Sequence, residues 1–319
     1  MGRYLVRRLL TAVPTLLLIS FVLFAVLSLA PGDPLSQFAA NPAVPPEVRE
    51  NIKRSLGLDQ PWPIRYVKWI TSMVQGDWGF SFASRIPVWE LLKLRIPSTL
   101  AVVGLAYLFS LVLAIPIGIY SAIRQYSIQD HVATTLAFIG FSLPTFFTGT
   151  LFIIVFSAKL QWLPFIYDST LQVTDFETLT AQLKQSIMPI GVLALFQTAT
   201  LVRYTRASML ENLPLDYVRT ARAKGLAQAH VIGRHVVRNS LIPVVTLIAL
   251  TAPTVFAGAL ITEQIFRVPG IGSLLITSIQ NSDTPVVMAI TFTFSVLVVL
   301  FNVIADMMYG VLDPRIRYD

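Results

Sequence analysis

The stretch Ile96–Ile123 reads IPSTLAVVGLAYLFSLVLAIPIGIYSAI, and its 28 residues include no Asp, Glu, Lys or Arg. A helix of about 20 apolar residues crosses the hydrocarbon core of a bilayer, so this stretch is long enough to span a membrane. It lacks the sustained alternation of apolar and polar residues that marks the strands of a membrane barrel. Because the backbone inside lipid must satisfy its own hydrogen bonds, we expect a transmembrane helix here.

Further stretches without charged residues lie on both sides of this one along the chain. They are Leu9–Ala30, Val132–Ala158, Gln185–Val202, Asn239–Thr262 and Thr284–Ala305. Each is about as long as a membrane span, and Gln185–Val202 is the shortest. The sequence therefore predicts an all-α membrane protein with six transmembrane helices.

The composition of the chain supports this class. Hydrophobic residues make up 55% of the 319 positions and charged residues only 13%, whereas soluble domains carry about 25% charged residues. These values exclude a soluble enzyme, a disordered chain and a collagen-like fibre. The chain has no Cys, so disulfides, thiolate metal sites and Cys nucleophiles are excluded as well.

The first charge-free stretch also resembles a signal peptide. Three arginines precede it, and Ser28-Leu29-Ala30 has the small residues of a cleavage site. However, its 22 residues exceed the usual apolar region of about 7–15 residues, and Pro31 would directly follow the cut. We therefore expect it to persist as the first membrane helix.

The distribution of charge predicts the orientation of the chain. With six spans, both termini lie on one side, and that side carries 13 Lys and Arg against 6 Asp and Glu. The other side carries 11 basic and 11 acidic residues. Because basic residues concentrate on the cytoplasmic side, both termini are predicted to be cytoplasmic. The net charge of +7 is thus explained by topology, and nucleic acid is not needed as a partner.

A long segment, 31–95, follows the first span on the external side. Pro46-Glu47 opens a predicted amphipathic helix that ends near Gly57, and Pro63 opens a second one. Four of the five Trp residues lie in this segment. Two interpretations stay open: a belt of Trp in the headgroup region, or a cap that binds an external partner.

The connection 203–238 holds seven of the 13 cytoplasmic basic residues. Pro214 should interrupt the preceding helix, Asp216 is a candidate N-cap, and Gly225 is a candidate stop. The pattern predicts a helix of about eight residues, too short to be stable alone. Either partner proteins hold this helix, or the connection is a solvated loop kept basic only to set the topology.

The sequence lacks the motifs of several common enzyme classes. The sequence contains no Gly-Lys dipeptide for a P-loop, no HExxH zinc motif and no Gly-x-Ser-x-Gly elbow. The six stretches contain no ionisable carboxylate, Lys or Arg, which ion-coupled transporters usually keep inside the bundle. Weak candidates for lining a translocation path are Gln197, Thr251 and Thr254, although helix-to-helix hydrogen bonds also explain them. The pattern favours a conduit whose energy comes from elsewhere.

The connection 203–238 resembles the EAA-type loop of ABC importer permeases, and more narrowly the dipeptide/oligopeptide/nickel branch. The residues that carry this resemblance are Asp216-Tyr217-Val218-Arg219-Thr220-Ala221-Arg222-Ala223-Lys224-Gly225-Leu226, Arg234-His235 and Arg238-Asn239-Ser240-Leu241-Ile242-Pro243. The likeness continues along the whole chain in Pro31-Gly32-Asp33-Pro34, Gly76-Asp77-Trp78-Gly79, Arg95-Ile96-Pro97-Ser98-Thr99, Ser142-Leu143-Pro144-Thr145, Glu263-Gln264-Ile265-Phe266, Pro269-Gly270-Ile271-Gly272 and Leu312-Asp313-Pro314-Arg315. The shared order matches the first (B-type) permease of such systems.

The resemblance implies the type I ABC importer permease (MetI-like) fold. It divides the chain into a cytoplasmic N-terminus 1–8, transmembrane helix 9–30, an extracytoplasmic segment 31–95, and a core permease domain 96–319 with the coupling loop 203–238. It implies a multi-pass protein of the plasma (inner) membrane that translocates short peptides delivered by an extracytoplasmic binding protein. The implied partners are a homologous second permease, membrane lipid and two cytoplasmic ABC ATPases. The ATPases bind ATP-Mg and hydrolyse it, so this chain needs no cofactor or metal and is not itself an enzyme.

The resemblance also implies that a coupling helix contacts an ATPase. Its residues are Asp216, Tyr217, Arg219, Thr220, Ala221, Arg222, Lys224 and Gly225. The sequence departs from the general E-A-A…G frame by placing Arg219-Thr220 where Glu-Ala would stand, and Arg238 occupies the usual proline position. Import of nickel or another small solute is the alternative within this family. A channel or secondary transporter that acts alone is the alternative from another class.

Overall fold

In the computed structural model, which describes residues 2–29, 47, 50 and 59–312, the regular structure is helical apart from an isolated bridge between Phe80 and Pro87. The helices in chain order are α1 (Gly2–Leu29), α4 (Trp62–Val74), α5 (Val88–Ile123), α6 (Ile128–Ser142), α7 (Thr145–Phe152), the π-helical η1 (Ile153–Lys159), α8 (Phe176–Asn212), α9 (Asp216–Ala223), α10 (Gln228–His230), the π-helical η2 (Val231–Val237), α11 (Arg238–Phe266), α12 (Ile271–Gln280) and α13 (Thr284–Leu312). The amphipathic helix predicted at 46–57 lies outside the described residues.

The described helices confirm an all-α membrane architecture. Five are long and apolar enough to cross a membrane: Val6–Leu29, Val88–Ile123, Phe176–Asn212, Gln228–Ala252 and Thr284–Met307. Two pairs of shorter helices meet the same criteria but are sharply bent, which raises the count to as many as seven. The predicted six agree with this range when α6 and α7–η1 form one broken span.

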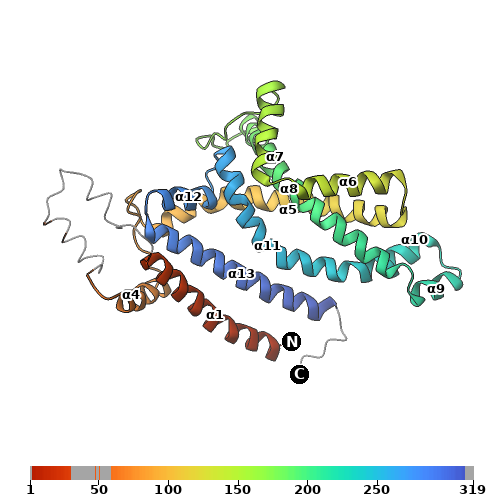
Figure 1. Cartoon of the computed structure of the whole chain (residues 1–319), viewed down its shortest axis with the longest axis horizontal. Coiled ribbons are helices and arrows are strands. Elements are labelled where there is room, and N and C mark those ends of the chain that lie inside the picture. Colours follow the sequence, from red (N-terminus) through yellow and green to blue (C-terminus); the bar gives the residue numbers. More distant parts are fainter. Residues whose placement is uncertain (1, 30–46, 48–49, 51–58, 313–319) are drawn as a thin grey trace.

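The break between α6 and α7 lies within the single span predicted at 132–158, and the two helices meet there at 104°. Pro144 has no backbone N–H and disfavours a helical conformation at the residue before it. Leu143 is accordingly extended, with φ −88° and ψ 126°. In Figure 1, α7 therefore stands upright while α6 lies along the molecule.

The centre of the bundle is the packing of α5 against α8. Gly118 of α5 allows a close approach, because a methyl group there would lie 2.6 Å from Cβ of Thr205 on α8. Apolar residues of α5, including Val102 and Val103, continue this contact with Met188 and Val192 of α8. Small residues at helix crossings are typical of packing inside membranes.

The first and last helices, α1 and α13, run side by side (Figure 1). Nε of Arg8 lies 3.0 Å from Oδ2 of Asp306, so the beginning of α1 and the end of α13 are at the same end of the molecule. The helix α4, which begins at Trp62 and so agrees with the start predicted from Pro63, packs on α1. The Trp69 ring lies 5.8 Å from Phe24 and 6.1 Å from Phe292 of α13.

The end of the segment 31–95 is anchored to the core through Asp283, in the turn between α12 and α13. Its side chain is buried and accepts hydrogen bonds from the Ser81 hydroxyl and from the backbone N–H groups of Phe82 and Ala83, the latter two at 3.0 and 3.2 Å. One carboxylate therefore fixes the loop that leads from α4 into α5.

Candidate functional site at the connection between α8 and α11

The short helix predicted from Asp216 to Gly225 is present as α9, Asp216–Ala223. The prediction that Asp216 is its N-cap is wrong: Leu215 holds that position, in an extended conformation and without a side-chain cap. Asp216 instead lies in the first turn, where a negative charge is favourable. Gly225 has φ +77°, so it ends the helix in the left-handed conformation that glycine adopts most easily.

The helix α9 has a buried face and an exposed face. Val218 is fully buried and Ala221 is 6% exposed. Both pack against Met209 of α8 and Val231 of η2 in one apolar cluster. The other predicted coupling residues are exposed except Tyr217, which is half-buried: Asp216, Arg219, Thr220, Arg222, Lys224 and Gly225. The inner face thus attaches α9 to the bundle, and the outer face is open.

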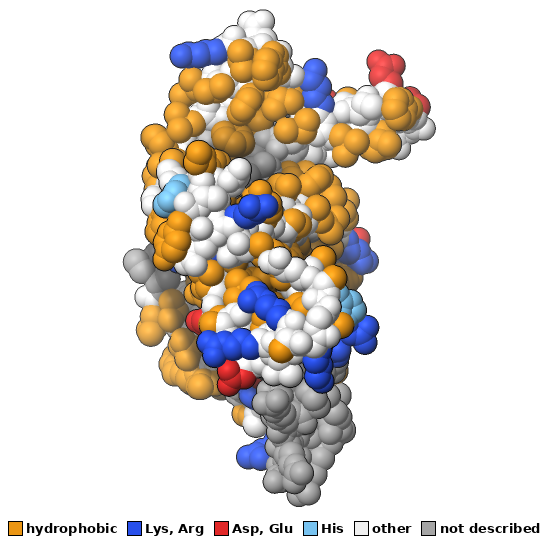
Figure 2. Space-filling model, turned by 90° about the vertical axis from the view of Figure 1, so that its right-hand side faces the viewer, with side chains coloured by type: hydrophobic (Ala, Val, Ile, Leu, Met, Phe, Trp, Pro, Cys, Tyr) orange, Lys and Arg blue, Asp and Glu red, His pale blue; other side chains and the backbone are white. Residues whose placement is uncertain are grey.

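The exposed surface around α9 is basic. Figure 2 views this end of the molecule and shows Lys and Arg side chains spread over it, with few Asp or Glu among them. The exposed basic residues of the connection are Arg219, Arg222, Lys224, Arg234 and Arg238. Arg219 and Asp216 approach to 3.5 Å with both side chains exposed, and such a pair adds little stability.

Hydrogen bonds connect α9 to two long helices. The Tyr217 hydroxyl donates to Oδ1 of Asn212 at 2.9 Å, and Nδ2 of Asn212 donates to the carbonyl of Ser208 at 2.9 Å. Ser208 and Ser240, on α8 and α11, each donate a hydroxyl to the carbonyl of the other, at 2.8 and 3.2 Å. A chain of hydrogen bonds therefore connects α9 to α8 and α11.

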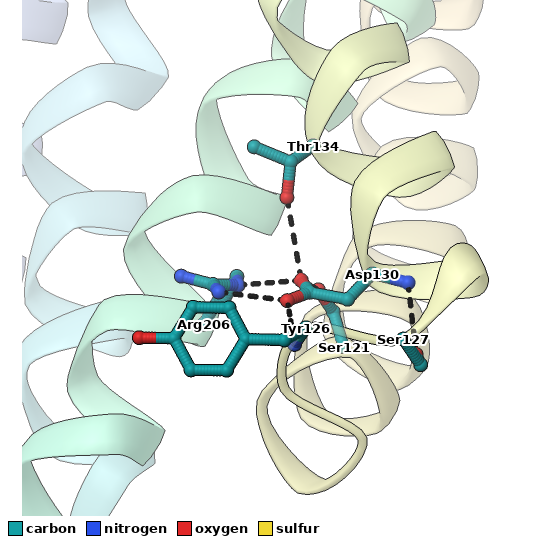
Figure 3. Close-up of polar contacts among 6 residues, drawn as sticks. All are labelled: Ser121, Tyr126, Ser127, Asp130, Thr134 and Arg206. Carbon is teal, nitrogen blue, oxygen red and sulfur yellow. Dashed lines mark hydrogen bonds and ion pairs between the residues drawn. The ribbon is translucent and has the colours of Figure 1, made fainter.

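A buried ion pair fixes α6 to α8 at the same end (Figure 3). Nε of Arg206 lies 2.7 Å from Oδ1 of Asp130, and Nη2 lies 2.8 Å from Oδ2. The Asp130 carboxylate also accepts from the Ser121 hydroxyl and from the backbone N–H of Tyr126. A bidentate pair with these additional donors has the geometry that makes a buried charge pair stable. In the sequence, these two residues contributed only to the count of charges on the predicted cytoplasmic side.

The weak candidates for a translocation path were Gln197, Thr251 and Thr254. Nε2 of Gln197 donates to Oγ1 of Thr251 at 3.3 Å, and the hydroxyl of Tyr107 donates to the carbonyl of Ile248 at 2.6 Å. Gln197 and Thr251 thus join α8 to α11, as expected for helix-to-helix hydrogen bonds. Thr254 lies in α11, but its side chain is outside the described residues.

The structure also contains a buried carboxylate that the sequence pattern did not predict. Glu263 was treated as lying just beyond the stretch 239–262, but α11 continues to Phe266 and Glu263 is fully buried. Its oxygens accept from Thr99 at 2.6 Å and from the N–H of Ser273 at 3.0 Å. The carboxylate also lies close to Gly270, where a methyl group would lie 2.1 Å from Glu263 Oε1, and no local pattern in the sequence indicates these contacts.

Comparisons with known proteins agree with this architecture. Residues 114–318 match the family "Binding-protein-dependent transport system inner membrane component", and residues 1–103 match the N-terminal region of the membrane components of such systems. In the solved structure of the MetNI methionine ABC transporter, a chain aligns with a TM-score of 0.53 at 15% identity, over 70% of this chain and 97% of that one. This likeness confirms the type I importer permease fold.

Relatives of similar length extend over the whole chain. The oligopeptide transport system permease protein AppB of Bacillus subtilis is 40% identical and covers 100% of both chains. The dipeptide transport system permease protein DppB of Escherichia coli is 37% identical, over 100% of this chain and 99% of its own. The glutathione transport system permease protein GsiC of Pectobacterium atrosepticum is 36% identical over the full length of both. The chain is thus a multi-pass inner membrane protein and belongs to the family of inner membrane components of binding-protein-dependent transport systems.

Proposed function

We propose that this chain is the transmembrane subunit of an ABC importer for short peptides. Three relatives that match the full chain are named for oligopeptides, dipeptides and glutathione, and all three substrates are short peptides. The proposed substrate is therefore a peptide of a few residues, delivered by an extracytoplasmic binding protein. A homologous second permease completes the pathway through the membrane.

The observation that carries the mechanism is the two-faced helix α9. Its buried face, with Val218 and Ala221, belongs to the apolar cluster at the ends of α5, α8 and η2. Its open face carries Arg219, Arg222 and Lys224. A short helix with this arrangement is suited to sit on a partner and pass its movement to the long helices. We propose that the partner is one of two cytoplasmic ATPases, which bind and hydrolyse ATP-Mg.

This assignment also fixes the proposed orientation. The end of the bundle that carries α9 is the cytoplasmic one, in keeping with its basic surface. Arg8 and Asp306 pair near the two termini, and α1 enters the bundle from the same end as α9 (Figure 1). Both termini are therefore cytoplasmic in this proposal, and α4, α12 and Asp283 lie on the external side.

Reconstitution of the complete system tests the proposal. The chain would be purified together with its second permease and ATPases, placed in vesicles with the binding protein outside, and given a labelled dipeptide, with ATP inside. We expect uptake only when ATP, ATPases and binding protein are all present. Uptake by this chain alone would instead establish a channel or secondary transporter, and uptake of nickel ions without peptide would establish the metal alternative.

A further inference from the structure

Arg203 was expected at the start of the cytoplasmic connection 203–238. In the structure it lies within α8, before the last turns of that helix. The helix α8 continues to Asn212, nine positions further, so the Cα of Arg203 lies about 13 Å along the axis from that end. Side chains in a helix tilt toward its N-terminus. Since α8 runs toward α9, the guanidinium of Arg203 reaches away from the α9 end and farther into the bundle.

Aromatic rings surround the guanidinium on one side. Its Cζ lies 4.8 Å from the ring centroid of Phe141 and 5.5 Å from that of Phe138, both on α6. Phe141 in turn stacks on Phe196 of α8, with ring centroids 5.9 Å apart. Phe138 is 53% exposed and Phe141 44% exposed. Arg203 therefore rests on an aromatic surface that is open on its other side.

Among the residues that the structure describes, this guanidinium has no anionic partner. Within the described part of the chain, no carboxylate lies within 4.0 Å of it and none of its N–H groups makes a hydrogen bond. One turn further along α8, Arg206 makes a bidentate pair with Asp130, the acidic residue at the start of α6. The planar N–H groups of Arg206 are thus paired with a carboxylate. Those of Arg203 have no such partner among the described residues.

We propose that Arg203, on its aromatic surface of Phe138 and Phe141, binds the carboxylate of the peptide during translocation. This proposal rests on the function proposed above. A guanidinium matches a carboxylate in a planar, bidentate geometry, and exposed rings beside it offer contact to the apolar part of a peptide. Ionisable groups inside membrane spans typically mark the path of a substrate.

A peptide offers both groups that this site can bind: a carboxylate for the guanidinium and apolar side chains for the exposed rings of Phe138 and Phe141. A lipid phosphate carries the same kind of charge, so the experiment below distinguishes the two sources.

The test compares peptides with a free and an amidated C-terminus in the complete reconstituted transporter. Uptake is measured at saturating peptide, after the binding protein is shown to load with each. We expect Arg203→Met to reduce uptake of the free peptide by about tenfold or more, the loss of one charge-assisted bidentate contact. Uptake of the amidated peptide should change by less than about twofold. The control is Lys93→Met, which removes an external cation that lies over Trp89 and pairs with Glu90.

Three outcomes would overturn the proposal. An equal reduction for both peptides would mean that Arg203 holds α6 to α8 or contacts another subunit. An effect that requires anionic lipid, and disappears in vesicles of phosphatidylcholine alone, would identify a lipid phosphate as the ligand. No change for either peptide, while the unmodified complex imports both, would defeat this site but leave the peptide function standing. If the unmodified complex imports no peptide at all, the result contradicts the proposed function itself and not only the site at Arg203.

Discussion

Thr99 donates a 2.6 Å hydrogen bond to Glu263, which lies 164 positions further along the chain. The hydroxyl of Thr99 also accepts from the backbone N–H of Ile271 at 2.8 Å, and Oε2 of Glu263 accepts from the N–H of Ser273. One carboxylate thus joins α5 and α11 to the beginning of α12. This contact holds the bend of 82° between the last part of α11 and α12.

Replacement of Glu263 by Ala should lower the free energy of unfolding by about 1–3 kcal/mol, because the N–H of Ser273 loses its buried acceptor. Glu263→Gln should cost less, since the amide oxygen can still accept from Ser273 while its NH₂ faces Thr99. Thermal or denaturant unfolding of the detergent-purified protein measures both. The control is Glu90→Ala, whose partner Lys93 is exposed, and it should change the stability by less than about 0.5 kcal/mol.

The packing of α5 on α8 gives a second prediction. Gly118→Ala places a methyl group 2.6 Å from Thr205 Cβ and 3.0 Å from the carbonyl oxygen of Val202, so the helices must separate at a cost of about 1–3 kcal/mol. Gly104 lies on the same helix with nothing within 4 Å of its added methyl group. Gly104→Ala should therefore be neutral or stabilising by up to about 1 kcal/mol. Equal unfolding curves for the two variants would contradict this packing.

The sequence was sufficient for the helices but not for the contacts between them. The lengths of the charge-free stretches located the long helices. Pro214 and Gly225 predicted the two ends of α9 to within a residue. Both signals are local in the chain, which is why the sequence alone reveals them. The partners of Glu263 and of Asp130 are distant, with Arg206 76 positions from Asp130, and no local pattern selects them. The helices α8 and α11 also continue past Arg203 and Glu263, although the charge-free stretches end just before these residues.

The pair of Asp130 and Arg206 gives a third prediction. Asp130→Asn leaves the Arg206 guanidinium without its charge partner in a mostly buried position, so we expect a loss of about 3–5 kcal/mol in stability. The double variant Asp130→Asn, Arg206→Gln removes the unpaired charge and should recover part of that loss. A double-mutant cycle on unfolding free energies measures the coupling. Additive losses would show that the pair contributes nothing beyond its separate side chains.

Charge reversal on the open face of α9 gives the last prediction. Arg219 and Arg222 are exposed, so Arg219→Glu with Arg222→Glu should leave the fold intact and lower ATP-driven uptake by about tenfold or more through repulsion at the ATPase surface. Ala221→Asp differs in kind, because Ala221 is only 6% exposed and a charge there would disrupt the cluster under α9.

The readouts are uptake and ATP hydrolysis stimulated by loaded binding protein, together with co-purification of the ATPases. Arg124→Glu is the matched control, an exposed arginine at the same end of the bundle in the turn between α5 and α6. It should leave uptake within about twofold, since it lies outside α9. Normal ATP-driven uptake by the double reversal in an assembled complex would show that another surface of this chain receives the ATPase movement.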